Sequence, residues 1–167
     1  SYEELMYGAS LTPLLEEKSD IYLAASKDTA TWEAHNNLGV TFIQMSEKVA
    51  DANAKADYIA KAKAQLELST GIEKTAENLN NLGVCYLLVG QKDKALTAYS
   101  SAEGSKAGGD NVVFKFIKAG KGTAEIRYAE YPNAIANSGE AFDTIPAALF
   151  NLGLAQLLSK DFDKAKA

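Results

Sequence analysis

The chain has 167 residues, of which 47% are hydrophobic and 23% are charged, a composition typical of a globular protein with one sizeable core. Its formal net charge of −5 argues against nucleic acid or an anionic membrane surface as partner, and no apolar run reaches the roughly 18–20 residues of a membrane span. A single cysteine, Cys85, excludes an internal disulfide bond and leaves the cellular compartment open.

The N-terminal residues predict two helices. Residues 2–9 are expected to form a short helix, and a second helix follows with Pro13 in its first turn and Thr12 as its cap. We interpret residues 1–30 as a divergent first repeat that caps an array of similar units. Because the chain begins at Ser1 without a methionine, we also expect it to be a processed or trimmed piece.

The tripeptide Asn-Leu-Gly occurs three times in the chain. Its copies begin at Asn37, Asn81 and Asn151. Apolar residues spaced three and four apart around the second copy predict a helix. A glycine inside a helix costs roughly 0.5–1 kcal/mol relative to alanine, a cost that is tolerated where another backbone must come close. Gly39, Gly83 and Gly153 are therefore predicted to lie where helices cross.

The helices expected after the first two copies share a small–large–small pattern. Its members are Ala62, Leu66 and Ser69 in one copy and Ala95, Tyr99 and Ala102 in the next, while Tyr22 and Ala25 repeat the last two positions near the N-terminus. Small side chains let facing helices approach closely, and the large side chain fills the space beside them. Gly90 is expected to break the chain between the two helices of the second copy.

The stretch from Asn81 to Ala102, with Leu82-Gly83, Tyr86 and then Ala95, resembles one tetratricopeptide repeat, whose signature is W-x2-L-G-x2-Y followed by A-x3-F. The resemblance implies an all-α fold: a right-handed superhelix of antiparallel helix hairpins, with about four to five units in a single domain. The units are expected at residues 1–30, 31–75, 76–109, 110–145 and 146–167. The last unit is truncated inside its second helix, so we expect more protein to follow in the natural molecule.

Two irregularities interrupt the expected period. The distance from Gly39 to Gly83 is 44 residues (83 − 39), about ten more than the family period. The excess lies in residues 45–57, which predicts that both helices of this unit are lengthened; the alternative is a flexible loop. The third unit is degenerate, with Gly122 in the role of Gly83 after a glycine-rich break at residues 103–111.

Members of the resembled family use fixed positions on the first helix of each unit to line a concave groove for a peptide. Carried over by position, the resemblance implies a groove that includes Asn36, Asn37, Val40, Asn80, Asn81, Val84, Arg127, Asn151 and Leu154, together with Glu33 and Glu77. An asparagine side chain both donates and accepts hydrogen bonds, so the residue before each Leu-Gly could hold the backbone of an extended peptide. The alternative is that these amides bond neighbouring helices or water.

Neither a carboxylate-binding groove nor an apolar ligand groove is favoured by these positions. Some members of the family grip a terminal carboxylate with lysine and arginine, but the matching positions here hold Asn36, Asn80 and Ala119, so that specificity is not expected. Arg127 is then either an anion contact or a solvated or ion-paired side chain. The apolar residues around Val84 and Leu154 favour core packing over an apolar ligand groove.

Signals for an enzyme are weak. His35 is the only histidine, which excludes a metal site of several histidines from one chain, and it is interpreted as structural. Cys85 lies on an apolar helix and is expected to be an inert buried thiol. The segment 120–123 lacks the order G-x4-G-K-[ST] of a phosphate loop. We therefore expect that the protein is not an enzyme and that it has no catalytic residue, no metal site and no cofactor.

Two functional hypotheses follow. The first is a non-catalytic protein–protein or peptide interaction module that presents a concave groove. The second is a structural spacer or assembly domain of a larger protein, because residues 3–9 leading into Leu38-Gly39 look like the tetratricopeptide segments of bacterial cell-envelope proteins. This loose resemblance points toward the periplasm, and a signal peptide and wall-binding domain in the full gene would favour it.

Overall fold

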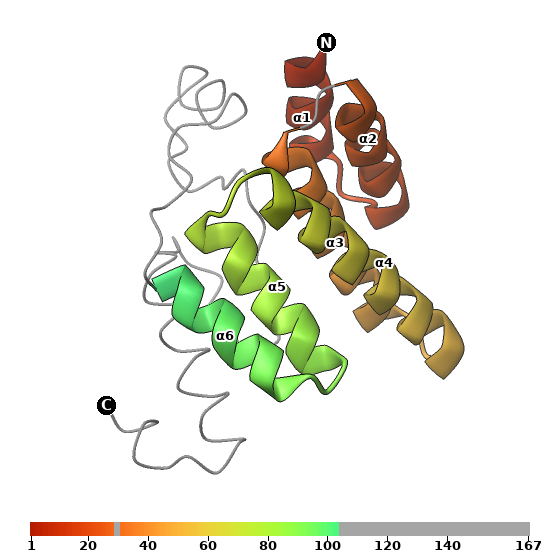
Figure 1. The fold of residues 1–167 in the computed structure, drawn as a ribbon. Helices are drawn as coiled ribbons and strands as arrows, with labels where there is room; N and C mark the ends of the chain where they lie inside the picture. Colours follow the sequence, from red (N-terminus) through yellow and green to blue (C-terminus); the bar gives the residue numbers. More distant parts are fainter. Residues whose placement is uncertain (29–30, 104–167) are drawn as a thin grey trace.

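The structure is a computed structural model that describes residues 1–28 and 31–103 (Figure 1). Within these ranges the chain is all-α, with six helices and no strand. The helices are α1 (Tyr2–Leu11), α2 (Leu15–Asp28), α3 (Trp32–Lys48), α4 (Ala52–Ile72), α5 (Ala76–Leu88) and α6 (Lys92–Glu103). None of them combines the length and the hydrophobicity that crossing a bilayer requires.

Each described helix packs mainly on its neighbours in sequence. Contacts join α1 to α2, α2 to α3, α3 to α4, α4 to α5 and α5 to α6, and a smaller contact joins α3 to α5. In Figure 1, α5 lies between α4 and α6, and α1 and α2 lie on the other side of α3 and α4 from α5 and α6. The contacts between consecutive helices therefore bury a core that continues from one helix pair to the next.

The first two helices form as predicted, but the residues between them act differently. The hydroxyl of Thr12 donates to the carbonyl oxygen of Gly8 at 2.8 Å, so Thr12 closes the last turn of α1. The prediction that Thr12 caps α2 was wrong, because α2 begins at Leu15 and its cap position is therefore Leu14. The first turn of α2 closes instead between the Lys18 amide and the Leu14 carbonyl at 2.9 Å, and Pro13 precedes that helix.

The long spacing between Gly39 and Gly83 comes from two long helices. Helix α3 has 17 residues and α4 has 21, whereas α5 has 13 and α6 has 12. Only residues 49–51 link α3 to α4, and the Asp51 carboxylate caps α4 by accepting from the Ala54 amide at 2.8 Å. The prediction of lengthened helices is confirmed, and the alternative of a flexible loop was wrong.

The glycines of the first two Asn-Leu-Gly copies lie where helices meet. A β-carbon on Gly39 would lie 2.7 Å from Leu66 Cγ, and one on Gly83 would lie 2.5 Å from Tyr99 Cε1. Both distances are shorter than real contacts allow, so glycine is needed at both helix crossings. The prediction is confirmed for Gly39 and Gly83, and Gly153 lies outside the described residues.

The residues of the small–large–small pattern are buried in the second helix of each described helix pair. They are at most 1% exposed in all three helix pairs: Tyr22 and Ala25 on α2, Ala62, Leu66 and Ser69 on α4, and Ala95, Tyr99 and Ala102 on α6. Gly90 has a φ of 76°, the left-handed conformation that ends α5 and allows the turn into α6. The register of the second pair therefore repeats in the third.

The later units lie outside the described residues. The units expected at 110–145 and 146–167 lie there, and so does the break expected at 103–111 except for Glu103, which is the last residue of α6. The number of units and the right-handed superhelix stay predictions.

Candidate interaction surfaces

Four of the predicted groove residues form a buried row of amides on α3 and α5. Asn36, Asn37, Asn80 and Asn81 are each at most 1% exposed. Asn81 Nδ2 donates to Asn36 Oδ1 at 3.0 Å, which joins α5 to α3, and Asn36 Nδ2 donates to Asn37 Oδ1 at 3.1 Å. The structure thus joins Asn36, Asn37 and Asn81, from two successive helix pairs, in one hydrogen-bonded row, with Asn80 buried next to Asn81 in the sequence.

The other predicted groove residues differ in place. Val40 and Val84 are buried, and Val84 packs with Ala95 and Tyr99 between α5 and α6. Arg127, Asn151 and Leu154 lie outside the described residues, as do the units to which they belong.

Asn78, which sequence reasoning missed, connects three helices. Its Nδ2 donates to Ser69 Oγ at 3.0 Å and to the Glu73 carbonyl at 2.7 Å, and its Oδ1 accepts from the Thr75 amide at 2.9 Å. The Ser69 hydroxyl donates in turn to the Trp32 carbonyl at 2.8 Å. The spacing Thr-x-x-Asn at the start of α5 resembles a capping box and could have pointed to this residue.

An acidic group lies one turn before the amide row. Burial raises the pKa of Glu33 above its usual 4.5, and the negative charge of Glu73 raises it further. Nearby, the Thr31 hydroxyl donates to the Tyr2 hydroxyl at 2.7 Å, and burial raises the pKa of Tyr2 from 10.0 to about 12. This end of α3 therefore favours a neutral or cationic neighbour over an anion.

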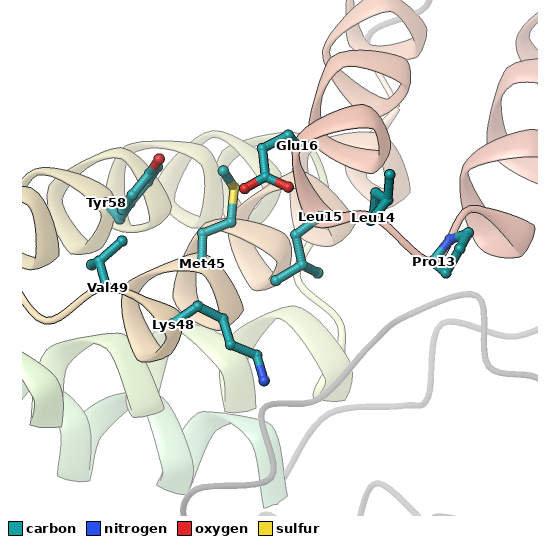
Figure 2. Close-up of a pocket in the computed structure, with 8 residues that line it drawn as sticks. All are labelled: Pro13, Leu14, Leu15, Glu16, Met45, Lys48, Val49 and Tyr58. Carbon is teal, nitrogen blue, oxygen red and sulfur yellow. The ribbon is translucent and has the colours of Figure 1, made fainter.

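A first pocket, of about 310 Å³, opens between the α1–α2 link and the α3–α4 turn (Figure 2). In Figure 2, Met45 lies near the centre, with Tyr58 and Val49 on one side and Leu15 on the other. Its rim carries one exposed cation, Lys48, and one exposed carboxylate, Glu16. Because these charges are opposite, the rim gives no preference for the charge of a ligand. The lining is completed by Pro13 and Leu14.

A second pocket, of about 380 Å³, lies over α5 between α4 and α6. Its floor is the apolar stripe of Leu79, Leu82 and Tyr86 on α5. Its walls come from the end of α4 and the link after it, with Thr70 and Lys74, and from α6, with Asp93, Lys94, Thr97, Ala98 and Ser101.

The single histidine of the chain is half-buried between two helices, and the single cysteine is buried. His35 Nδ1 and Gln65 Oε1 are hydrogen-bonded at 2.8 Å between α3 and α4. Cys85 is buried, its thiol lies 3.7 Å from the Ile59 carbonyl oxygen, and burial raises its pKa from 9.0 to about 12. A thiol with so high a pKa is a poor nucleophile at neutral pH. In the described ranges no three His, Cys, Asp or Glu residues are grouped so as to hold a metal ion.

Comparisons with protein-family models, with curated proteins and with solved structures find no match for this chain.

Proposed function

We propose that the chain is a non-catalytic protein-interaction module of the tetratricopeptide type. The observation that carries the proposal is the hydrogen bond between Asn81 and Asn36, because it makes the predicted groove positions of two successive helix pairs neighbours. An amide side chain both donates and accepts hydrogen bonds, as the backbone groups of an extended peptide do.

Amide exchange is the proposed mechanism. A peptide carbonyl would accept from Asn81 Nδ2, and a peptide N–H would donate to Asn36 Oδ1, in place of the 3.0 Å bond between them. One hydrogen bond between side chains is exchanged for two to the peptide, which gives up its own bonds to water, so the net change in hydrogen-bond free energy is small. Because both amides are at most 1% exposed, the row must open to admit the peptide. Affinity and specificity would then come from side chains of the peptide beside the row.

The second candidate is a structural spacer or assembly domain, such as one within a bacterial cell-envelope protein. The same bond favours it, because amides that bond each other across α3 and α5 hold two helix pairs together. The connection from Trp32 through Ser69 to Asn78 has the same effect. A full gene that encodes a signal peptide and a wall-binding domain would support this candidate.

A capture experiment with two variants separates the candidates. The double variant Asn36→Ala/Asn81→Ala removes both partners of the 3.0 Å bond and also removes the donor to Asn37 Oδ1, a loss that costs about 1–3 kcal/mol at a buried group. Asn78→Ala removes amide bonds of similar burial outside the row. If the row binds a peptide, proteins captured by the wild-type chain are lost with the double variant and kept with Asn78→Ala, measured below both melting temperatures.

The opposite pattern would favour the spacer. Capture that is unchanged in the double variant, quantified by mass spectrometry against the wild-type chain, would show that the amide row does not contact the partner.

A further inference from the structure

The pocket over α5 has an apolar floor that is wide enough for an aromatic ring system. Leu79, Leu82 and Tyr86 follow one another at helical spacing, and Leu79 and Leu82 are each 6% exposed. An engineered protein cavity of about 150 Å³ lined by apolar side chains holds benzene. The volume of this pocket, about 380 Å³, therefore leaves room for a larger ring. Because the pocket is open on one side, the peptide that carries the ring can stay outside it.

The pocket lies at the place where the preceding helix pair has a polar bridge between its two helices. In the preceding pair, His35 lies four residues before Gly39 and Gln65 lies one residue before Leu66, and the two side chains meet at 2.8 Å between α3 and α4. The equivalent residues of the next pair are Leu79, four before Gly83, and Ala98, one before Tyr99.

Leucine and alanine cannot make the bridge that histidine and glutamine make. The space that the bridge occupies in one pair is therefore left open in the next.

The charged lining residues of the pocket carry one more positive than negative charge, whereas the whole chain carries a net charge of −5. These lining residues are two exposed lysines, Lys74 on the α4 side and Lys94 on α6, and one exposed carboxylate, Asp93. Lys94 Nζ lies 5.6 Å from the centre of the Tyr86 ring. The Tyr86 hydroxyl donates to Glu67 Oε1 at 3.1 Å, which fixes the ring at the end of the pocket. The exposed Glu67 carboxylate beside Tyr86 lies 4.0 Å from Lys63 Nζ, which offsets its negative charge.

We propose that this pocket is a second interaction site, which takes an aromatic side chain of a partner peptide flanked by acidic residues. The ring inserts over Leu79, Leu82 and Ala98, and the flanking carboxylates pair with Lys74 and Lys94. An aromatic anchor in an apolar pocket, with charge complementarity at the rim, is a common arrangement of protein–peptide contacts. The pocket shares no lining residue with the amide row, so it goes beyond the function proposed above.

Three short peptides test the ring and the charge separately, with the complete chain as receptor. The probe is acetyl-Glu-Trp-Glu-amide, the control for the ring is acetyl-Glu-Ala-Glu-amide, and the control for charge is acetyl-Lys-Trp-Lys-amide. Titrations followed by amide chemical shifts are expected to place the probe at Leu79, Leu82 and Ala98. Both controls are expected to bind about tenfold more weakly or worse.

Variants of the protein supply the second test. The double variant Leu79→His/Ala98→Gln copies the His35–Gln65 bridge and should weaken the probe by about tenfold or more. Lys94→Glu lies on the surface, where folding is not at stake, and should reverse the preference between the acidic and the basic peptide. Lys55→Glu makes the same charge change on an exposed part of α4 away from the pocket and serves as the matched control.

Several results would overturn the proposal. These are shifts that map elsewhere, no saturation at millimolar probe, equal binding by the bridged double variant, or a loss with Lys55→Glu as large as with Lys94→Glu. The variant Asn36→Ala/Asn81→Ala should bind the probe as the wild-type chain does. A failure of the amide-row mechanism is thereby distinguished from a failure of this one.

Discussion

Gly39 and Gly83 have no side chain at the points where a β-carbon would collide with the facing helix. At Gly83 the collision is with the ring of Tyr99, which is fully buried and has no open space to move into. At Gly39 it is with Leu66 Cγ, the branch point of a buried side chain. Glycine lowers the stability of a helix relative to alanine, but here it allows a close contact between helices that a residue with a β-carbon would prevent.

Gly83→Ala is therefore expected to destabilise the protein by about 1–3 kcal/mol, because overpacking outweighs the better helix propensity of alanine. Gly71→Ala on α4 is the matched control: a β-carbon there meets nothing within 4 Å, and the variant should gain about 0.5–1 kcal/mol. Urea unfolding followed by circular dichroism measures both. Equal effects of the two substitutions would contradict the close contact at Gly83.

Tyr99 has a hydroxyl that is buried and has no hydrogen-bond partner among residues 1–28 and 31–103. A buried polar group without a partner costs about 1–3 kcal/mol, whereas the ring beneath it fills the space over Gly83. Tyr99→Phe should therefore leave the free energy of unfolding unchanged or raise it by up to about 2 kcal/mol. Tyr99→Ala, which removes the ring as well, should lower it by about 3–5 kcal/mol. A clear loss of stability in Tyr99→Phe would mean that the hydroxyl is bonded.

At the scale of the elements, the joint between α3, α4 and α5 rests on Asn78. Its side chain caps α5 through the Thr75 amide, satisfies the Glu73 carbonyl after the end of α4, and reaches α3 through the Ser69 hydroxyl. Polar groups at helix ends need such partners when they are buried. One side chain therefore links the end of one helix pair to the start of the next.

Asn78→Ala should cost about 2–4 kcal/mol, since a cap is lost and buried groups of two other helices are left unpaired. Asp51→Ala removes the exposed cap of α4, which joins no second helix, and should cost only about 0.5–2 kcal/mol. Thermal unfolding of the two variants beside the wild-type chain gives the comparison. If Asp51→Ala proved the more harmful, the connecting role of Asn78 would be refuted.

At the scale of the whole molecule, a buried thiol and a partly buried phenol with raised pKa values should make the free energy of unfolding fall at alkaline pH. In the unfolded chain the Cys85 thiol loses its proton near pH 9.0, and in the folded chain it keeps the proton to about pH 12. As the pH rises between these values, proton loss favours the unfolded state. The contribution of the thiol to the free energy of unfolding is fully present below pH 9. Above pH 9 it falls by up to about 1.4 kcal/mol per pH unit. Tyr2, with a pKa raised from 10.0 to about 12, acts in the same direction.

Cys85→Ala should accordingly show a flatter loss of stability between pH 9 and pH 12 than the wild-type chain. The measurement is the free energy of unfolding by urea across that range, in parallel for both proteins. Identical slopes would show that the thiol is not protected from ionisation. Below pH 9 the variant is expected to be less stable than the wild-type chain, because a buried sulfur is lost, and the difference should narrow or reverse toward pH 12.

The sequence by itself determined the helices and the register within each pair. Helical spacing of apolar residues, a glycine in each first helix and small residues in each second helix are local patterns, and the contacts of Gly39 with Leu66 and of Gly83 with Tyr99 follow from them. The length of α3 and α4 could also be predicted, because an excess of residues rich in alanine and charge extends a helix more readily than it forms a loop.

Only the tertiary structure decided what the polar side chains and the spaces between helices do. Thr12 could bond either of two helices, and Asn36 and Asn81 could face a peptide or each other; spacing does not choose between such partners. The pocket over α5 needs the end of α4, the floor of α5 and the short Ala98 of α6 at one place. Hydrogen-bond partners and cavities depend on distances between residues far apart in the chain, which a periodic pattern does not contain.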